Sequence, residues 1–397
     1  MSLSLESRFL LDTLRASTGD SAVQPQLGQA ERLDPRRLLS AAQFHGVSPL
    51  VYKAITTLDS KCVPSQISDL FRQDVRHITL RLLQMTRELL DLLGLLEKEE
   101  IPTIAFKGPT LSIQAYGSPF MRQSGDLDLL VREEDLARAC SILASQGYKD
   151  TSEVAHARNL IHPTRGVAVD LHRWVSGPVG FAGSSEPLDI DSGSLFARSD
   201  HFIYQERRIR AFRIEDLLLV LCIHAAKHAW EKWIWLFDIQ ALIARHPELD
   251  WDELSRRAQE LRIAEPVYLS LRLTETICGS DLPPGALRGL NPRPEIERLI
   301  RPLHSDIVQD PSSLRSRMRT EFLPFQTLAT IREKTAYGVW LLKRRTAPNR
   351  ADLSSLRLPP YLHFLYVLTR PLRLMFNYGK EATGYIAFRL FSIRKSR

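Results

Sequence analysis

The hydrophobic pattern of the N-terminal part of the chain is helical. Apolar residues recur at steps of three and four residues within segments 5–16, 34–46 and 67–98. That spacing is the one expected for one face of an α-helix. The last segment contains Leu80, Leu82, Leu83, Met85, Leu89, Leu90, Leu93 and Leu96. We therefore expect one long amphipathic or buried helix there, preceded by a loop rich in Gly, Ser and Gln over 17–29.

From Ile101 the pattern changes to short apolar runs, which are typical of strands. Strands are predicted over 101–106, 126–131, 154–162 and 166–174, the last two as a hairpin. One helix is expected to open at Lys107-Gly108-Pro109 and run to Tyr116, because Gly108 can adopt an unusual backbone angle and proline suits a first helical turn. A second helix is predicted over 133–146, so the strands can form one small mixed sheet.

The helical period returns at Ile214 and is expected to continue to about His246. Residues 281–294, rich in Pro and Gly, have the composition of a linker, and no fixed-period repeat is visible. The fold class predicted is α+β, with a small mixed-sheet core flanked by N-terminal and C-terminal helical regions. The expected division is 1–98, 99–212, 213–280 and 281–397.

Composition places the chain among ordinary globular proteins, since 44% of its 397 residues are hydrophobic and 25% are charged. The four cysteines, Cys62, Cys140, Cys222 and Cys278, show no short spacing and fit a reducing compartment. We expect neither a secretory signal nor a transmembrane span, because charges interrupt every long apolar stretch. The location expected from these features is cytoplasmic.

The net charge of +7 comes largely from the C-terminal tail, where residues 351–397 contain eight Lys or Arg against two Asp or Glu. Aromatic and aliphatic residues alternate with these charges. Such a tail can contact a polyanion or an anionic membrane surface, or it can be a helix with a solvated basic face.

Asp126 and Asp128 are the candidate metal ligands. Alternation along a strand places both carboxylates on one face and Leu127 and Leu129 on the other. Mg²⁺ prefers oxygen ligands and neutralises phosphate charge during transfer at phosphorus. A lone Asp-x-Asp is a weak signal, and by itself it favours a solvated or capping pair.

The surrounding sequence strengthens the metal hypothesis. Lys107-Gly108-Pro109 lies before the pair and opens a helix whose free N–H groups can receive a phosphate. After the pair, Asp170 and His172 share one face of a later strand, so Asp170 can supply a third carboxylate.

The motif F-K-G-P-x-L…R-x-x-x-D-L-D-L-L-V…G-Y…V-D-L-H resembles a poorly characterised nucleotidyltransferase family of the DNA polymerase beta-like superfamily, over about residues 99–245. The resemblance implies that Gly108 belongs to the phosphate-contacting glycine turn. It also implies that Asp126 and Asp128 bind metal and that Asp170 completes the catalytic site. Pro109 departs from the superfamily turn, because it lacks an N–H donor. Lys107 and Arg122 can supply positive charge instead, or they can be solvated at the surface.

The helix after the sheet carries a second group of polar residues. His224, Lys227, His228 and Glu231 share one helical stripe, to which Asp238 returns if the helix continues that far. We expect His224, Lys227 and His228 to contact a nucleotide, the alternative being histidines of the core. His-Ala-Ala-Lys-His lacks the glutamate of a zinc HExxH motif. The tryptophans Trp230, Trp233 and Trp235 are expected to pack in the core.

Together these features predict transfer of a nucleoside monophosphate from an NTP to an acceptor, which can be RNA, protein or a small molecule. Mg²⁺ or Mn²⁺ is the expected cofactor, and pyrophosphate leaves. The alternative is a non-catalytic scaffold that binds a nucleotide or RNA on an inherited nucleotidyltransferase core. A third alternative is a peripheral membrane adaptor, for which the basic C-terminal tail is the only supporting feature.

Overall fold

The computed structural model describes residues 4–17, 32–57, 63–151, 157–176, 189–309, 323–328 and 330–346. The chain divides into two units, Met1–Leu328 and Ala329–Arg397. The second unit contains helix α15, Ile331–Thr346. The basic tail expected over 351–397 and Cys62 lie outside the described residues.

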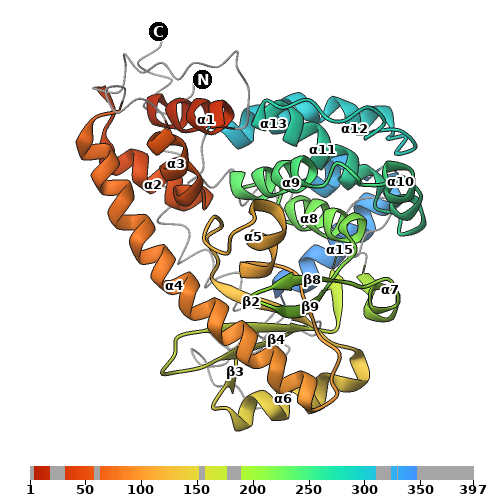
Figure 1. The fold of residues 1–397 in the computed structure, drawn as a ribbon. Coiled ribbons are helices and arrows are strands. Elements are labelled where there is room, and N and C mark those ends of the chain that lie inside the picture. Colours follow the sequence, from red (N-terminus) through yellow and green to blue (C-terminus); the bar gives the residue numbers. More distant parts are fainter. Residues whose placement is uncertain are drawn as a thin grey trace. The chain divides into compact units, whose positions relative to one another are not determined.

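The N-terminal part of the first unit is helical, as the apolar spacing predicts (Figure 1). Its helices are α1 (Leu5–Ser17), α2 (Pro35–His45), α3 (Ser48–Thr57) and α4 (Ser65–Lys98). Asp34 caps α2 by accepting hydrogen bonds from the N–H groups of Arg36 and Arg37. Gly46 ends that helix at φ 71°, a left-handed conformation that glycine adopts without steric cost.

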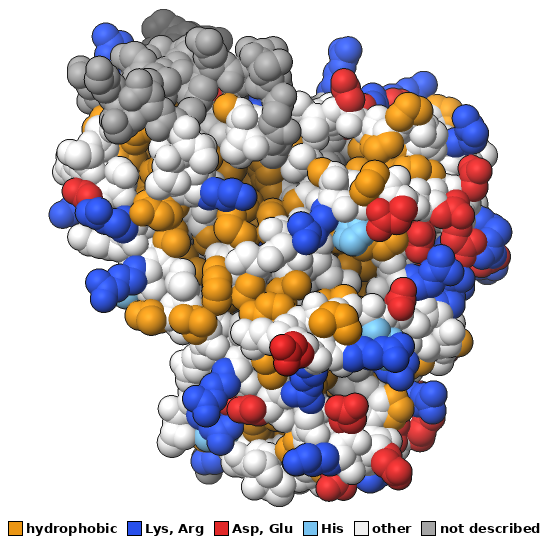
Figure 2. Space-filling view, in the orientation of Figure 1, with side chains coloured by type: hydrophobic (Ala, Val, Ile, Leu, Met, Phe, Trp, Pro, Cys, Tyr) orange, Lys and Arg blue, Asp and Glu red, His pale blue; other side chains and the backbone are white. Residues whose placement is uncertain are grey.

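Helix α4 is amphipathic along its length. Its buried residues Leu82, Met85 and Leu89 pack on the sheet, but Leu80 and Leu83 are 57% and 48% exposed. These two leucines therefore lie outside the buried stripe of α4. The apolar residues predicted for this helix between Leu80 and Leu96 thus do not all lie on its buried face. Hydrophobic side chains gather on the middle of the face shown in Figure 2, over the region that α4 crosses.

The mixed sheet has the strand order β1-β2-β5-β4-β3. The strands are β1 (Ile104–Ala105), β2 (Asp126–Leu130), β3 (Lys149–Asp150), β4 (Ala157–Ile161) and β5 (Ala168–His172). β2 and β5 are parallel, whereas β1 pairs antiparallel with β2 and β4 pairs antiparallel with β5. The α+β class and the hairpin of β4 and β5 are confirmed, and β1 is shorter than predicted.

The two faces of the sheet differ in chemistry. Leu127 and Leu129 of β2 join Val169 and Leu171 of β5 in a buried cluster with α4 and α6 (Leu136–Ser145). The alternate residues of both strands point to the opposite face, which carries the carboxylates. Helix α5 (Gly108–Tyr116) follows β1 on the chain, as expected from Lys107-Gly108-Pro109.

Two hairpins follow the sheet. One pairs β6 (Trp174–Ser176) with β7 (Asp189–Asp191), and short helix α7 (Ser192–Ala197) follows it. The other pairs β8 (Asp200–Tyr204) with β9 (Arg207–Ala211).

The helices that follow in the first unit include α8 (Ile214–Lys227), α9 (Trp233–Arg245), α10 (Trp251–Glu260), α11 (Ala264–Cys278), α12 (Pro294–Arg298) and α13 (Ile300–Gln309). They share one hydrophobic cluster with α1, α2 and α3. Residues 281–293 contain no helix or strand, but Ala286 and Leu290 within them are buried. Over the described residues, no helix combines the length and apolar character needed to cross a bilayer.

The helix expected from Ile214 to His246 is interrupted. Ala229 and Trp230 adopt φ values of 49° and 50°, and their N–H groups donate to Ala226 O and Ala225 O. This pattern is a Schellman motif, in which Trp230, completely buried, provides the apolar contact after the helix end. The break turns the chain so that α9 starts a new direction at Trp233.

Candidate active site

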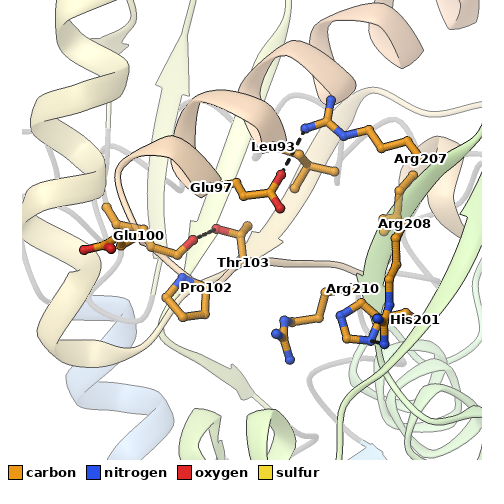
Figure 3. Close-up of a pocket in the computed structure, with 11 residues that line it drawn as sticks. Leu93, Glu97, Glu100, Pro102, Thr103, His201, Arg207, Arg208 and Arg210 are labelled. Carbon is orange, nitrogen blue, oxygen red and sulfur yellow. Dashed lines mark hydrogen bonds and ion pairs between the residues drawn. The ribbon is translucent and has the colours of Figure 1, made fainter.

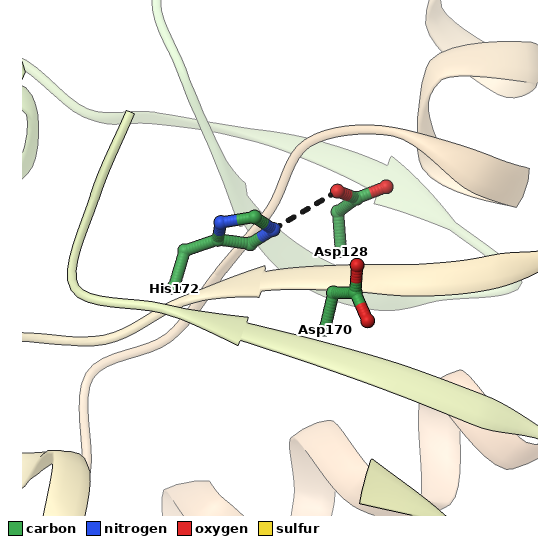
Figure 4. Close-up of side chains that lie close together, drawn as sticks. All are labelled: Asp128, Asp170 and His172. Carbon is green, nitrogen blue, oxygen red and sulfur yellow. Dashed lines mark hydrogen bonds and ion pairs between the residues drawn. The ribbon is translucent and has the colours of Figure 1, made fainter. Parts of the chain in front are cut away.

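The parallel register of β2 and β5 brings the predicted carboxylates together. Asp128 pairs with Asp170 in register, and Asp126 lies two residues earlier on the same face of β2. Figure 4 shows the Asp128 and Asp170 carboxylates on neighbouring strands, with His172 directed at Asp128. The sequence-based prediction that these strands are neighbours is confirmed.

Asp128 is the most enclosed of the three carboxylates. Its Oδ1 accepts a hydrogen bond from Lys107 Nζ at 2.9 Å and a second from His172 Nε2 at 3.0 Å. Burial would raise the pKa of Asp128, but the Lys107 charge and the His172 contacts outweigh it and hold that pKa below its ordinary value. Asp128 is therefore anionic at neutral pH.

The pKa values of Asp126 and Asp170 shift in the opposite direction to that of Asp128. Burial, followed by the charges of Asp128 and Asp170, raises the pKa of Asp126 to about 6. Burial and the Asp128 charge also raise the pKa of Asp170, whose Oδ1 accepts a hydrogen bond from Asn159 Nδ2 at 2.6 Å. A shared cation would relieve this repulsion between carboxylates.

The donor set fits a divalent cation. Ligand atoms of Asp128, Asp170 and His172 lie within 4.8 Å of one another. Among the described residues, these three form the cluster of His, Cys, Asp or Glu side chains that is close enough to hold a metal ion. Asp126 is outside this group although it shares the face. Two carboxylates suit Mg²⁺, whereas an added imidazole suits Mn²⁺ and other transition metals better. His172 was placed on the correct face by alternation but was not included among the predicted site residues.

Gly108 lies where α5 begins, directly after Lys107. Its φ is 58°, and a Cβ at this position would stand 3.2 Å from Asp126 O. Both facts require glycine at this position, because L residues avoid this backbone region. Gly108 is thus in van der Waals reach of the carboxylate strand.

The carboxylates lie at one wall of a pocket of about 710 Å³, which we call the carboxylate pocket. Lys107, Arg122, His224, Lys227 and His228, all predicted to bind nucleotide, line the same pocket. Its volume is in the range of ordinary ligand sites. Helices far apart in the chain therefore converge on the strand pair.

Arg122 has a structural partner in this pocket. Its Nε donates to Asp238 Oδ2 at 2.7 Å, and its Nη1 donates to Ser124 Oγ at 3.0 Å. Asp238 also accepts from Tyr116 Oη at 2.9 Å and is fully buried. Because α8 ends at Lys227 and Asp238 lies in α9, the helix does not continue far enough for Asp238 to return to the stripe of His224.

The end of α8 forms another wall. His224, Lys227 and His228 line it together with Trp235 from α9, but Glu231 is not among the lining residues. The His224 and His228 rings lie 5.2 and 5.3 Å from the Trp235 ring. Burial and the Lys107 charge lower the pKa of His224, and desolvation and the Lys227 charge lower that of His228, so both rings are neutral.

Trp230 and Trp233 are buried as expected, whereas Trp235 faces the pocket.

The N-terminal helices complete the pocket with residues that no motif indicated. Gln43 and Gly46 come from the end of α2, and Ile78, Arg81 and Leu82 come from α4. Arg81 Nη2 donates to Gly125 O at 3.3 Å, immediately before Asp126. The site is therefore built from the sheet and from helices on both sides of it in the sequence.

The chain belongs to a nucleotidyltransferase family. Residues 31–279 match the family described as "Uncharacterised nucleotidyltransferase". This match covers more than half of the chain, so the resemblance over 99–245 is confirmed and extends into the N-terminal helices. No curated protein matches the chain.

Solved structures show weaker similarity. The solution structure of the antibiotic-resistance factor ANT(2'')-Ia has a TM-score of 0.33 and 14% identity, covering 47% of this chain and 91% of that one. The crystal structure of the lincosamide antibiotic adenylyltransferase LnuA, bound to lincomycin, has a TM-score of 0.31 and 18% identity, covering 40% and 96%. Similarity at this level identifies neither the substrate nor the acceptor of this chain.

Proposed function

We propose that the chain transfers a nucleoside monophosphate from an NTP to an acceptor, with Asp126, Asp128 and Asp170 as catalytic and metal-binding residues. The observation that carries this proposal is the register of Asp128 with Asp170 at the wall of the carboxylate pocket, in a chain of a nucleotidyltransferase family. Three carboxylates on one sheet face repel one another unless cations lie between them.

The reaction breaks the bond between the α-phosphorus of the NTP and the oxygen that bridges to the β-phosphorus. The acceptor oxygen or nitrogen forms the new bond to phosphorus, its proton passes to a base, and pyrophosphate leaves. Mg²⁺ or Mn²⁺ bound by the carboxylates would neutralise phosphate charge. Asp170 is the proposed base, because its carboxylate lines the pocket beside Asp128, where the acceptor would approach the bound NTP.

Cationic side chains on the facing walls are the proposed phosphate ligands. Lys107 and Lys227 line the pocket from the start of α5 and the end of α8. Gly108 offers the first N–H of α5, and Pro109 removes the next. Arg122 can contribute Nη2, since its Nε and Nη1 already donate to protein groups. The neutral rings of His224 and His228 can exchange hydrogen bonds with the ribose or the acceptor.

A labelling experiment tests the reaction. The protein is incubated with each α-³²P-labelled NTP, Mg²⁺ or Mn²⁺, and a cell extract, and labelled products are treated with nuclease or protease to find the acceptor class. Asp126→Asn and Asp170→Asn are expected to remove labelling while remaining folded. The exposed Asp252→Asn is the matched control and should label like wild type. His228→Ala should reduce labelling less than either active-site variant.

Undiminished labelling by Asp126→Asn would falsify the catalytic assignment. A wild-type protein that binds NTP tightly but labels nothing with any NTP or extract would favour the scaffold function. Separate measurement of NTP binding in the same preparations distinguishes these two results.

A further inference from the structure

A second pocket lies at the opposite end of β1 from Lys107. It has a volume of about 260 Å³, and its lining comes from the end of α4, the residues before β1 and the hairpin of β8 and β9. None of its lining residues lines the carboxylate pocket. We call it the hairpin pocket.

The hairpin presents its basic side chains to this pocket from both of its faces. Arg207 points to α4, where it donates to Leu90 O and lies 3.6 Å from Glu97 Oε2. Gly94 leaves room for this guanidinium, because a Cβ there would stand 2.8 Å from Arg207 Nη2. Arg207 thus fixes the hairpin to α4 and has its charge matched by a carboxylate.

Arg208 and Arg210 lie on the opposite face of the hairpin from Arg207. Their register with Ile203 and His201 places all four side chains on the other face of the hairpin. Figure 3 shows Arg208 and Arg210 grouped with His201 on one side of the pocket, away from Glu100. Within the part of the chain that the structure describes, neither of these two guanidinium groups has an ion pair with a carboxylate.

The contacts of His201 add a third donor. Arg208 Nη2 donates to His201 Nδ1 at 3.3 Å, so that nitrogen is the acceptor and the ring proton is on Nε2. Arg210 Nη1 donates to Ser199 Oγ at 2.8 Å, which orients the guanidinium without neutralising it. Desolvation and the charges of Arg208 and Arg210 lower the pKa of His201, in agreement with a neutral ring.

This arrangement offers the donors that an oxyanion needs. His201, Arg208 and Arg210 lie on one face of the hairpin and line the same pocket, and among the described residues neither guanidinium is paired with a carboxylate. Arginine is well suited to bidentate phosphate contacts. The like charges repel one another until such an anion binds. Glu97 and Glu100 line the other side, and they would repel a polyanionic strand passing through the pocket.

We propose that the hairpin pocket binds the phosphate group of a small phosphate monoester through Arg208, Arg210 and His201. The phosphate lies at the hairpin, and the uncharged body of the ligand extends toward Pro102 and Thr103. The site is separate from the proposed catalytic site, and its occupancy does not depend on the transfer reaction.

Equilibrium binding to the full-length protein tests the site. Inorganic phosphate, ribose 5-phosphate and ribose are titrated at constant ionic strength set with potassium chloride. Arg208→Gln with Arg210→Gln should weaken ribose 5-phosphate binding at least tenfold. Arg36→Gln with Arg298→Gln, which removes two exposed arginines elsewhere, should leave it unchanged. Arg208→Gln alone, at an exposed position, provides a second variant that cannot disturb the core.

Ribose 5-phosphate is expected to bind at least as tightly as inorganic phosphate, and ribose is expected not to bind. Equal affinity of the wild type and both hairpin variants for ribose 5-phosphate would overturn the proposal. Binding of inorganic phosphate alone would also overturn it, because a monoester would then be excluded. Loss of single-stranded RNA retention by the hairpin variants, with monoester binding unchanged, would assign the arginines to a polynucleotide instead.

Discussion

Arg122 Nε donates to Asp238 Oδ2 at 2.7 Å, and the two side chains are 9% and 1% exposed. The pair joins the segment before β2 to helix α9. Tyr116 Oη, at the end of α5, donates to the same carboxylate. This buried ion pair therefore connects three elements that surround the carboxylate pocket, and the position of Arg122 in that pocket depends on it.

Asp238→Asn should destabilise the fold strongly. The substitution keeps the size of the side chain but leaves the Arg122 charge buried without a counter-charge, which typically costs about 3–5 kcal/mol. Urea unfolding at neutral pH measures this loss. Asp69→Asn is the control, because its ion pair with Arg72 is exposed and should contribute less than about 1 kcal/mol. Equal losses in the two variants would contradict a stabilising role for the buried pair.

Gly108→Ala should reduce stability and nucleotide binding together. An L residue at φ 58° costs about 1–2 kcal/mol, and the new Cβ would press on Asp126 O. Gly125→Ala is the matched control for stability alone, because no atom lies within 4 Å of its added Cβ but it lines the carboxylate pocket. Unfolding of both variants tests the stability change, and NTP titration of Gly108→Ala against the wild type tests binding. A Gly108→Ala protein as stable as Gly125→Ala would show that the turn relaxes without cost.

Much of the site could be predicted because its signals are local. Alternation along β2 and β5 identifies which carboxylates share a face, and Lys107-Gly108-Pro109 indicates a strand followed by a helix. The register that aligns Asp128 with Asp170 follows from burying Leu127, Leu129, Val169 and Leu171 on the other face. Residues from α2 and α4 could not be assigned, because Gln43 and Arg81 reach the pocket only through tertiary packing.

Two turns could not be predicted from the sequence. The Schellman motif after α8 has Ala229 where glycine is usual, so the apolar pattern continues through the turn. The turn between β8 and β9 uses Gln205 and Glu206 at φ 47° and 63°, in place of the usual Asn-Gly or Asp-Gly. That hairpin was consequently not predicted. Both turns place non-glycine residues in the left-handed region, which tertiary contacts must stabilise.

Acidification should destabilise the fold through His45. Its ring stacks on Trp233 at 3.8 Å, and burial followed by the Lys232 charge lowers its pKa to about 3. Since the unfolded chain binds the proton at the ordinary pKa of about 6.5, stability is complete above that value and falls as pH decreases toward 3. The expected loss from this residue between pH 7 and pH 5 is about 2 kcal/mol.

Urea unfolding at several pH values measures this effect, and His45→Gln isolates it because glutamine does not titrate. The variant is expected to be less stable at pH 7 but to lose less stability on acidification. An identical pH dependence in the two proteins would show that His45 has the same pKa in the folded and the unfolded chain, which contradicts the prediction.

The carboxylate pocket should bind metal-NTP more tightly than NTP alone, and Asp128→Asn should abolish that difference. The reason is that the amide keeps the shape of the side chain but lacks the charge that attracts a divalent cation. Calorimetric titration with MgNTP, MnNTP and metal-free NTP measures it, with Asp252→Asn as the exposed control.

His172→Gln distinguishes two roles for the imidazole. If His172 only orients Asp128, metal affinity should fall about 10–100-fold for both ions, whereas a direct ligand should make the loss larger for Mn²⁺ than for Mg²⁺. Equal affinity of the wild type for NTP with and without metal would rule out the metal assignment of Asp126, Asp128 and Asp170.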